Sequence, residues 1–548
     1  MKVSELLVNS LEAQGVQRAY GLIGTSVLDL MDALSRSKVR YVSTRHEQVA
    51  VSMADAEGRV TGMPGVALVH GGPGFLNALV GLGNAWKDGS PLVLVAGAVK
   101  RRMVGMDSWL ETPQLAMAAS MVKKGWRIER GQEAGPAFAE AFALASSAPK
   151  GPVYLEVPED VWQQEAGSPP VALPQDKPNY PGVEEVRRVA DALRGARRPL
   201  LVFGGGMNSP EGARAAARLQ AKIGAPFVST SNGRGVMPED HPLAAGRIGF
   251  GGLRLADSLL AQADLVLCLG CGLSDVSTYG YNATPKGEVI AVNMDPIWDK
   301  KPVPYSLHSN SDAAGFAERL TEFIDEVHAQ DGWLTLLEAG RTSWAAALAE
   351  SQSISKEGYV NPARFLGVLE KALPRDAILA AGQGLHQVYA YAMLKVKAER
   401  SFLAAANMGS MGFVFPAALG AKMACPEREV VAVMGDGEFM MTMQDLETAV
   451  REKVGTKLVV VNDNSYRVLL MRQKIQKMGR VFGTRHTNPD LAKLAEDFGA
   501  TGVSVHSDDG IDAAVGFLMG KSDVPRIVEL RVDPEDLPPI NIQGSLMF

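Results

Sequence analysis

The sequence predicts an α/β protein of three domains, each a mostly parallel sheet flanked by helices. A length of 548 residues is too great for one ordinary hydrophobic core. Short β-branched runs alternate with glycine turns and amphipathic segments, which favours parallel sheets. The clearest predicted strands span residues 64–70, 199–204, 289–293, 430–434 and 457–461.

Two segments separate the predicted domains. Five prolines between residues 166 and 182 indicate an extended linker. A helical, tryptophan-containing stretch from about residue 329 to residue 359 precedes a new α/β unit. We therefore expect domains at residues 1–165, 183–330 and 358–548.

Composition excludes several classes of protein. A net charge of −6 gives no basic surface for nucleic acid.

The cysteines and the N-terminus predict the compartment. The three cysteines, at 268, 271 and 425, suggest no disulfide framework. The start of the chain has no signal-peptide pattern, so we expect a cytoplasmic protein. The Cys268-Leu-Gly-Cys271 motif is interpreted as a buried strand end rather than a redox or metal site.

Two stretches without Asp, Glu, Lys or Arg are long enough to suggest membrane spans, at residues 66–86 and 401–421. Glycine-rich loops interrupt both of them. We interpret each as a loop followed by a buried helix, and we expect no membrane segment.

Acidic side chains follow two predicted neighbouring strands of the third domain. Gly435-Asp436-Gly437 ends the first strand, a helix is expected over residues 438–453, and Asn462-Asp463-Asn464 ends the strand at residues 458–461. A right-handed crossover would place Asp436 and Asp463 at adjacent carboxyl ends, where such sheets bind ligands. Magnesium takes one or two carboxylates and completes its shell with phosphate oxygens, and the helix start offers free N–H groups to the same phosphates. The alternative is a pair of polar turns without a ligand.

This arrangement resembles the thiamine diphosphate enzymes of the acetolactate synthase, pyruvate oxidase and benzoylformate decarboxylase superfamily, along the whole chain. The resemblance implies a pyrimidine-binding domain, a Rossmann-like middle domain and a diphosphate-binding domain. It implies thiamine diphosphate and Mg²⁺ as cofactors, with Asp436, Asp463 and the backbone carbonyl of Ser465 as metal ligands. Most relatives carry asparagine where Asp463 stands, so we expect a more anionic metal site.

The same resemblance implies further cofactor contacts. His386 and Gln387 match the segment that contacts the diphosphate, although a purely structural histidine is the alternative. Gly409 would offer its carbonyl to the 4′-amino group of the cofactor. Met411 resembles the apolar wedge that bends the cofactor, whereas taken alone it is a core methionine. Gly435 and Gly437 flank Asp436 in the diphosphate-binding segment.

Glu47 lies at the start of a predicted helix over residues 49–59. Read alone, it is an acid that suits the helix dipole. The resemblance instead implies that its carboxyl group binds N1′ of the aminopyrimidine and shares a proton with it. The thiazolium ring then acts as an electron sink when a C–C bond breaks. In relatives Glu47 and Asp436 come from different subunits, so a homodimer is the minimum expected and a homotetramer the usual form.

Candidate substrate-side residues come from the first domain. His70 resembles the proton relay of benzoylformate decarboxylases, and a strand-end histidine bonded to backbone is the alternative. Thr25 follows the first strand and is expected to face the reacting carbon. Gln114 resembles the substrate-side glutamine of benzaldehyde lyase. Leu469 and Leu470 are candidate pocket walls.

The resemblance implies a 2-oxo acid decarboxylase, a carboligase or both, similar to benzoylformate decarboxylases. Such an enzyme cleaves or forms, without oxidation, a C–C bond next to the carbonyl of a 2-oxo acid or an aldehyde. Acetolactate synthase proper and 2-hydroxyacyl-CoA lyase are the alternatives. The middle domain has Ser274 to Tyr281 where the flavin-containing synthases carry Arg-Phe-Asp-Asp-Arg, so FAD is not expected. Gly204-Gly-Gly206 does not complete a dinucleotide motif, which argues against an NAD-binding module. The acidic, proline-rich tail after Asp533 is expected to close over the site.

Overall fold

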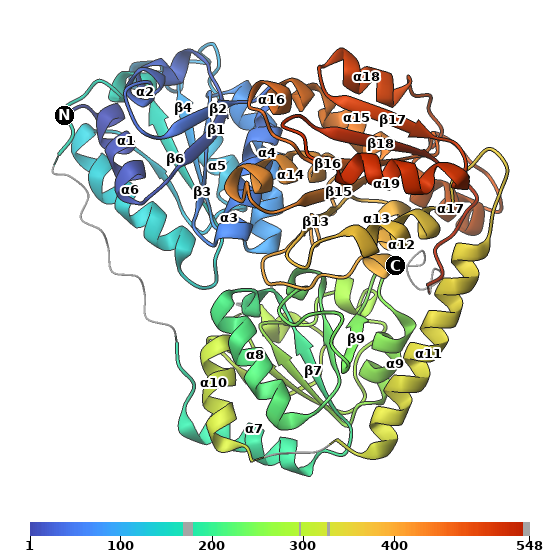
Figure 1. Ribbon diagram of the computed structural model, residues 1–548. Coiled ribbons are helices and arrows are strands. Elements are labelled where there is room, and N and C mark those ends of the chain that lie inside the picture. Colours follow the sequence, from blue (N-terminus) through green and yellow to red (C-terminus); the bar gives the residue numbers. More distant parts are fainter. Residues whose placement is uncertain (168–178, 295–296, 326–328, 541–548) are drawn as a thin grey trace.

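The computed structural model describes residues 1–167, 179–294, 297–325 and 329–540, and shows three six-stranded sheets (Figure 1). Every strand pair within these sheets is parallel, and helices flank each sheet. The predicted fold class is therefore confirmed. The strands of the three sheets fall inside the three predicted domain ranges, whose boundaries stay predictions, and most of the predicted linker lies outside the described residues.

The first sheet has the order β2-β1-β3-β4-β6-β5. Its strands are β1 (Arg18–Leu22), β2 (Arg40–Ser43), β3 (Gly65–Val69), β4 (Leu92–Ala98), β5 (Gly125–Arg127) and β6 (Pro152–Pro158). Its helices are α1 (Val3–Ala13), α2 (Leu28–Leu34), α3 (Glu47–Thr61), α4 (Pro73–Asp88), α5 (Gln114–Ala118) and α6 (Gly131–Ser146), with single 3₁₀ turns η1 (Thr25–Val27), η2 (Arg101–Met103) and η3 (Glu159–Val161).

The middle sheet has the order β12-β11-β10-β7-β8-β9, which is the 3-2-1-4-5-6 order of a Rossmann fold. Its strands are β7 (Pro199–Phe203), β8 (Phe227–Ser229), β9 (Ala244–Arg247), β10 (Leu265–Leu269), β11 (Glu288–Val292) and β12 (Tyr305–Ser309). Its helices are α7 (Val183–Gly195), α8 (Pro210–Ile223), α9 (Arg254–Gln262), α10 (Ala313–Phe323) and α11 (Asp331–Ser353), with turns η4 (Gly205–Met207), η5 (Ser231–Gly233), η6 (Val276–Thr278) and η7 (Trp298–Lys300). Cys268 is fully buried in β10, as expected.

The third sheet has the order β14-β13-β15-β16-β18-β17, the same connectivity as the first sheet. Its strands are β13 (Ile378–Ala381), β14 (Phe402–Leu403), β15 (Val430–Gly435), β16 (Lys457–Asn462), β17 (Thr501–Val505) and β18 (Arg526–Arg531). Its helices are α12 (Pro362–Ala372), α13 (Leu385–Met393), α14 (Val414–Ala424), α15 (Asp436–Thr442), α16 (Leu446–Arg451), α17 (Arg467–Gln476), α18 (Leu491–Asp497) and α19 (Ile511–Met519), with turns η8 (Met443–Asp445) and η9 (Asp508–Gly510).

One predicted helix differs from the structure. The segment expected as one helix over residues 438–453 begins at Asp436 and is interrupted by the turn η8. Asp445, fully buried in that turn, accepts hydrogen bonds from the backbone N–H of Arg45 and the hydroxyl of Thr448, both at 2.8 Å. This contact with the first domain fixes the chain where a continuous helix was expected.

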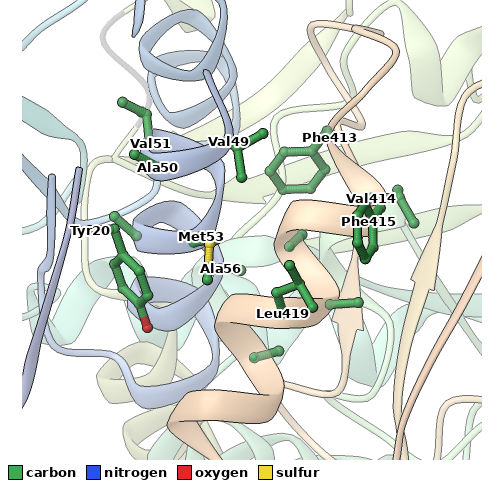
Figure 2. Packing of buried hydrophobic residues seen from close by; sticks show 14 of the residues in the cluster. Tyr20, Val49, Ala50, Val51, Met53, Ala56, Phe413, Val414, Phe415 and Leu419 are labelled. Carbon is green, nitrogen blue, oxygen red and sulfur yellow. The ribbon is translucent and has the colours of Figure 1, made fainter. Parts of the chain in front are cut away.

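The first and third domains share one hydrophobic core, centred on the packing of α3 against α14 (Figure 2). Val49 and Met53 of α3 and Phe413 and Leu419 beside or on α14 are buried in it. A Cβ on Gly420 would lie 2.3 Å from the carbonyl oxygen of Met53, so this close approach of the two helices requires glycine. The helices therefore fix the relative position of the two domains.

Within the described ranges, no helix is long and apolar enough to cross a membrane. The two uncharged stretches form strands, loops and the helices α4 and α14; α14 is buried as predicted, whereas one face of α4 is exposed.

Candidate active site

Four of the candidate site residues lie where the strand order of a sheet reverses. In the first sheet β1 and β3 are neighbours, and in the third sheet β13 and β15 are neighbours. At such a point the following loops leave in opposite directions and open a crevice at the carboxyl ends of the strands. Thr25 follows β1 and His70 follows β3, whereas His386 follows β13 and Asp436 follows β15.

Glu47 is the first residue of α3 and is 5% exposed. Its Oε2 accepts a hydrogen bond of 2.9 Å from Nδ2 of Asn77, on α4. A Cβ on Gly74 would lie 2.9 Å from Oε1, so the glycine leaves room for the carboxylate. The structure thus offers a nearly buried carboxyl group at a helix start, with Asn77 as a partner that the sequence did not predict.

His70 lies against the loop that follows β1. Its Nδ1 is 2.8 Å from the hydroxyl of Ser26 and 3.4 Å from the backbone N–H of the same residue. Because a backbone N–H can only donate, Nδ1 acts as an acceptor, and we assign the ring proton to Nε2. Burial lowers the pKa of His70, and the nearby charge of Glu47 partly opposes this shift. His70 is therefore neutral at neutral pH, with a donor at Nε2.

Two other predicted substrate-side residues differ in their surroundings. Thr25 is exposed, while Ser26, in the same predicted segment Gly24-Thr25-Ser26, holds His70. Gln114 is 2% exposed and its amide is fully engaged. It accepts from the N–H of Gly72 at 2.5 Å and donates to the carbonyl of Gly97 and to the hydroxyl of Tyr154, both at 3.0 Å. Gln114 thus holds the loop beside His70, and its contact with a substrate stays a prediction.

The two acidic residues of the third domain lie at adjacent strand ends, as predicted, because β15 pairs directly with β16. Asp436 is 2% exposed, and its Oδ2 accepts a hydrogen bond of 2.6 Å from Asn488 and lies 3.0 Å from Nε2 of His486. Burial raises the pKa of Asp436, and the charge of Asp463 raises it further. Two carboxylates that repel one another in a buried place favour a bound cation.

Asp463 has a cationic partner that the sequence analysis missed. Its Oδ1 accepts a 2.6 Å hydrogen bond from the hydroxyl of Ser465, and its Oδ2 lies 3.0 Å from Nε of Arg467. The expectation of a more anionic site stays a prediction, and Arg467 lies where its charge opposes that of the additional carboxylate.

The predicted diphosphate segment lies beside β15. His386 is 8% exposed, its Nε2 makes no hydrogen bond with the described residues, and it is 3.6 Å from Oε2 of Glu438. A Cβ on Gly435 would lie 2.7 Å from the His386 ring. The side chain of Gln387 donates to the hydroxyl of Tyr391, so its predicted cofactor contact would have to come from elsewhere on the residue.

Glu438 joins the remaining cofactor segments. Its carboxylate accepts from the N–H of Gln383 at 2.8 Å and from the N–H of Gly412 at 3.2 Å, and thereby holds the loops before α13 and α14 together. Met411 accepts through its carbonyl from Nε2 of Gln48 at 3.4 Å. Gly409 has a φ of +72° and open space around a would-be Cβ, which leaves its backbone accessible to a ligand.

These residues fit thiamine diphosphate and Mg²⁺. The orphaned Nε2 of His386 suits a phosphate oxygen, and Asp436 and Asp463 supply two hard oxygen ligands. Among the described residues, no group of three or more His, Cys, Asp or Glu side chains could hold a metal by itself. A metal here would complete its shell with backbone, water and phosphate oxygens, as Mg²⁺ does in phosphate sites.

Comparisons with known proteins agree with this geometry. Three models of the thiamine pyrophosphate enzymes match the chain: the N-terminal TPP-binding domain over residues 1–120, the central domain over residues 186–320, and the C-terminal TPP-binding domain over residues 382–530. The acetolactate synthase of Mycobacterium bovis is 30% identical over 545 residues, covering 96% of this chain and 88% of that protein.

The chain belongs to the thiamine pyrophosphate enzyme family.

Two further relatives cover nearly the whole of this thiamine pyrophosphate enzyme. The acetolactate synthase isozyme 3 large subunit of Escherichia coli is 29% identical over 99% of this chain and 97% of its own length. The probable acetolactate synthase large subunit of Methanocaldococcus jannaschii is 28% identical over 100% of this chain and 94% of its own length. The protein is accordingly a thiamine pyrophosphate-dependent enzyme that forms or cleaves C–C bonds.

Proposed function

We propose that this enzyme is a carboligase of the acetolactate synthase kind, which joins two 2-oxo acids with loss of CO₂ and depends on Mg²⁺. The observation that carries the proposal is the similarity to acetolactate synthases along the full length of both chains. The sequence alone favours a benzoylformate decarboxylase-like activity over this one, whereas the relatives support the acetolactate synthase kind better.

The residues have distinct roles in this proposal. Bound thiamine diphosphate supplies the electron sink that a bond beside a carbonyl needs in order to break. Glu47 shares a proton with N1′ of the pyrimidine, and its burial excludes water from that proton. Asp436, Asp463 and the carbonyl of Ser465 hold the metal, and His386 binds the diphosphate.

A second candidate activity is release of an aldehyde from one 2-oxo acid. The observation that favours it is the ring nitrogen Nε2 of His70, which Ser26 leaves free by occupying Nδ1; once the ring has taken up a proton from solvent, the imidazolium would be the general acid. In carboligation the N–H at Nε2 would orient the carbonyl oxygen of the second substrate. The two activities therefore share one residue and differ in whether an acceptor is captured before the proton is transferred.

We also propose that two copies of the chain form the active unit. Apolar side chains stay exposed near the candidate site, on α4 and on segments that contact it. Leu76 and Val80 on α4 are 39% and 40% exposed, and Met408, whose methyl group reaches Gly83 of α4, is 46% exposed. A homodimer would cover them, and a homotetramer is the expected form. Sedimentation equilibrium of the purified protein tests this directly.

The test of the activity uses the enzyme with thiamine diphosphate and Mg²⁺ and a panel of 2-oxo acids, pyruvate first. Acetolactate and CO₂ in equal amounts from two pyruvates support carboligation, whereas aldehyde and CO₂ in equal amounts support the second candidate. FAD is not expected to change either rate. Absence of CO₂ release from every 2-oxo acid would refute both.

Glu47→Gln is the matching variant. We expect turnover to fall by about 10²- to 10⁴-fold, the range of a lost proton-transfer group, with thiamine diphosphate still bound. Exchange of the C2 proton of the bound cofactor, followed by NMR, should slow in parallel. Glu184→Gln, an exposed change in the middle domain, is the control.

A further inference from the structure

The first residue of α17, Arg467, is buried against a predicted metal ligand. Its Nε lies 3.0 Å from Oδ2 of Asp463, four residues earlier in the chain, and the two side chains are 3% and 5% exposed. Charges at this depth need a partner, because the cost of removing them from water is large. The two residues thus form a buried ion pair at the edge of the metal site.

Arg467 also contacts residues other than Asp463. Its Nη1 donates to the carbonyl of Asp533 at 3.2 Å, and its guanidinium lies 5.9 Å from the ring centre of Tyr389. These contacts fix the cation independently of Asp463. The guanidinium is therefore a preorganised positive charge beside the carboxylate.

The two carboxylate oxygens of Asp463 have different partners. Arg467 takes Oδ2, while Oδ1 contacts only the small hydroxyl of Ser465 among the hydrogen bonds of the described residues. An asparagine at this position would have one neutral amide oxygen and one N–H₂ group. Asp463 together with Arg467 has the same zero net charge as that asparagine, with one oxygen engaged by the cation.

We propose that Arg467 is a positioning and charge-compensating residue, which lets this enzyme use an aspartate next to the anionic diphosphate. With Asp463 unpaired, two carboxylates and the diphosphate would stand together, and their repulsion would weaken cofactor binding. Arg467 removes one of these charges and fixes which oxygen of Asp463 is available. This inference rests on the proposed metal and diphosphate site.

A double-variant cycle tests the inference through binding rather than turnover. The variants are Arg467→Gln, Arg467→Lys, Asp463→Asn and the double variant Asp463→Asn/Arg467→Gln. The dissociation constant of thiamine diphosphate at saturating Mg²⁺ is measured by calorimetry, Mn²⁺ binding by electron paramagnetic resonance, and Tm without ligands by thermal unfolding. Arg480→Gln, an exposed change in the segment after α17, is the matched control.

We expect Arg467→Gln to weaken thiamine diphosphate binding about 10- to 100-fold, the range for groups that orient metal ligands. Arg467→Lys keeps the charge and should recover most of the affinity. The double variant should bind close to the wild-type level, although Arg467→Gln alone binds poorly. If Arg467→Gln does not fold, the double variant alone tests the inference, which requires that this variant fold and bind thiamine diphosphate.

Three outcomes are distinguishable. Unchanged cofactor affinity in Arg467→Gln, or a double variant as weak as the two changes combined, overturns the inference. The inference is also overturned if the changes at Asp463 and Arg467 are coupled in their effect on Tm but not in their effect on cofactor or Mn²⁺ binding. The ion pair would then stabilise only the fold. A wild-type protein that binds no thiamine diphosphate with Mg²⁺ refutes the proposed function instead.

Discussion

The hydroxyl oxygen of Ser26 lies 2.8 Å from Nδ1 of His70, and this contact determines which nitrogen of the imidazole faces the crevice as a donor. Ser26 in turn accepts from the N–H of Gly71 at 3.0 Å, so its own proton is directed at the imidazole. The histidine is therefore fixed in one tautomer by the loop that follows β1.

The lowered pKa of His70 predicts a pH dependence of stability. A histidine whose folded pKa lies below its ordinary value of 6.5 binds fewer protons in the folded than in the unfolded state. Its contribution to stability is complete above pH 6.5 and is lost as the pH falls through the lower folded value. Thermal unfolding between pH 5 and pH 8 should show that His70→Asn, which keeps an acceptor near Ser26, loses less stability on acidification. An equal loss in both proteins would contradict the assignment, and exposed His506→Asn is the control.

Gly24→Ala tests the position of the imidazole. Gly24 has an extended backbone, with a φ of −161°, so alanine brings no backbone strain. Its Cβ would lie 2.3 Å from Cγ of His70, and the ring must move. A displacement of about 1 Å can cost about 100-fold in rate, so kcat/KM should fall by one to two orders of magnitude. Gly516→Ala, where the Cβ meets nothing within 4 Å, should leave kcat/KM unchanged.

Asn488 orients Asp436 through its 2.6 Å hydrogen bond. Asn488→Ala should lower the affinity for Mg²⁺ about 10- to 100-fold, because Asp436 loses its closest donor. Titration of Mg²⁺ against thiamine diphosphate binding measures this change. The neighbouring exposed Thr487→Ala provides the control, and equal Mg²⁺ affinity in both variants would contradict the prediction.

The raised pKa of Asp445 predicts a pH dependence of stability opposite to that of His70. Burial raises its pKa from 3.8 to about 6, so the folded state binds more protons than the unfolded state between these values. Its stabilising contribution is complete below pH 3.8 and is lost as the pH rises through 6. Asp445→Asn cannot ionise. The free energy of unfolding of this variant should exceed that of the wild type by an amount that grows between pH 4 and pH 6, reaches at most about 3 kcal/mol, and stays constant above pH 6. Chemical unfolding at several pH values checks this, and a constant difference would refute it.

The elements with strong periodicity could be predicted from the sequence. The strands that end at Asp436 and Asp463, their adjacency and a helix that starts near Glu47 followed from local patterns, whereas the burial of Glu47 did not. Asn488 and His486 could not be predicted, because they reach Asp436 from a loop without periodicity, and Ser26 reaches His70 from a different strand end. The partner Arg467 could not be predicted either, because Asp463 lies before the start of α17, where the i, i+4 rule for helices does not apply.

The first and third sheets share one strand order, and α3 and α14 occupy equivalent places in it, after β2 and after β14. The start of α3 bears Glu47, and the loop before α14 bears Met411. This correspondence is what duplication of an ancestral gene segment produces, with later divergence of the two copies. Helices at equivalent places now pack against each other, α3 against α14, so an ancestor of one such domain would have paired with a copy of itself through that helix.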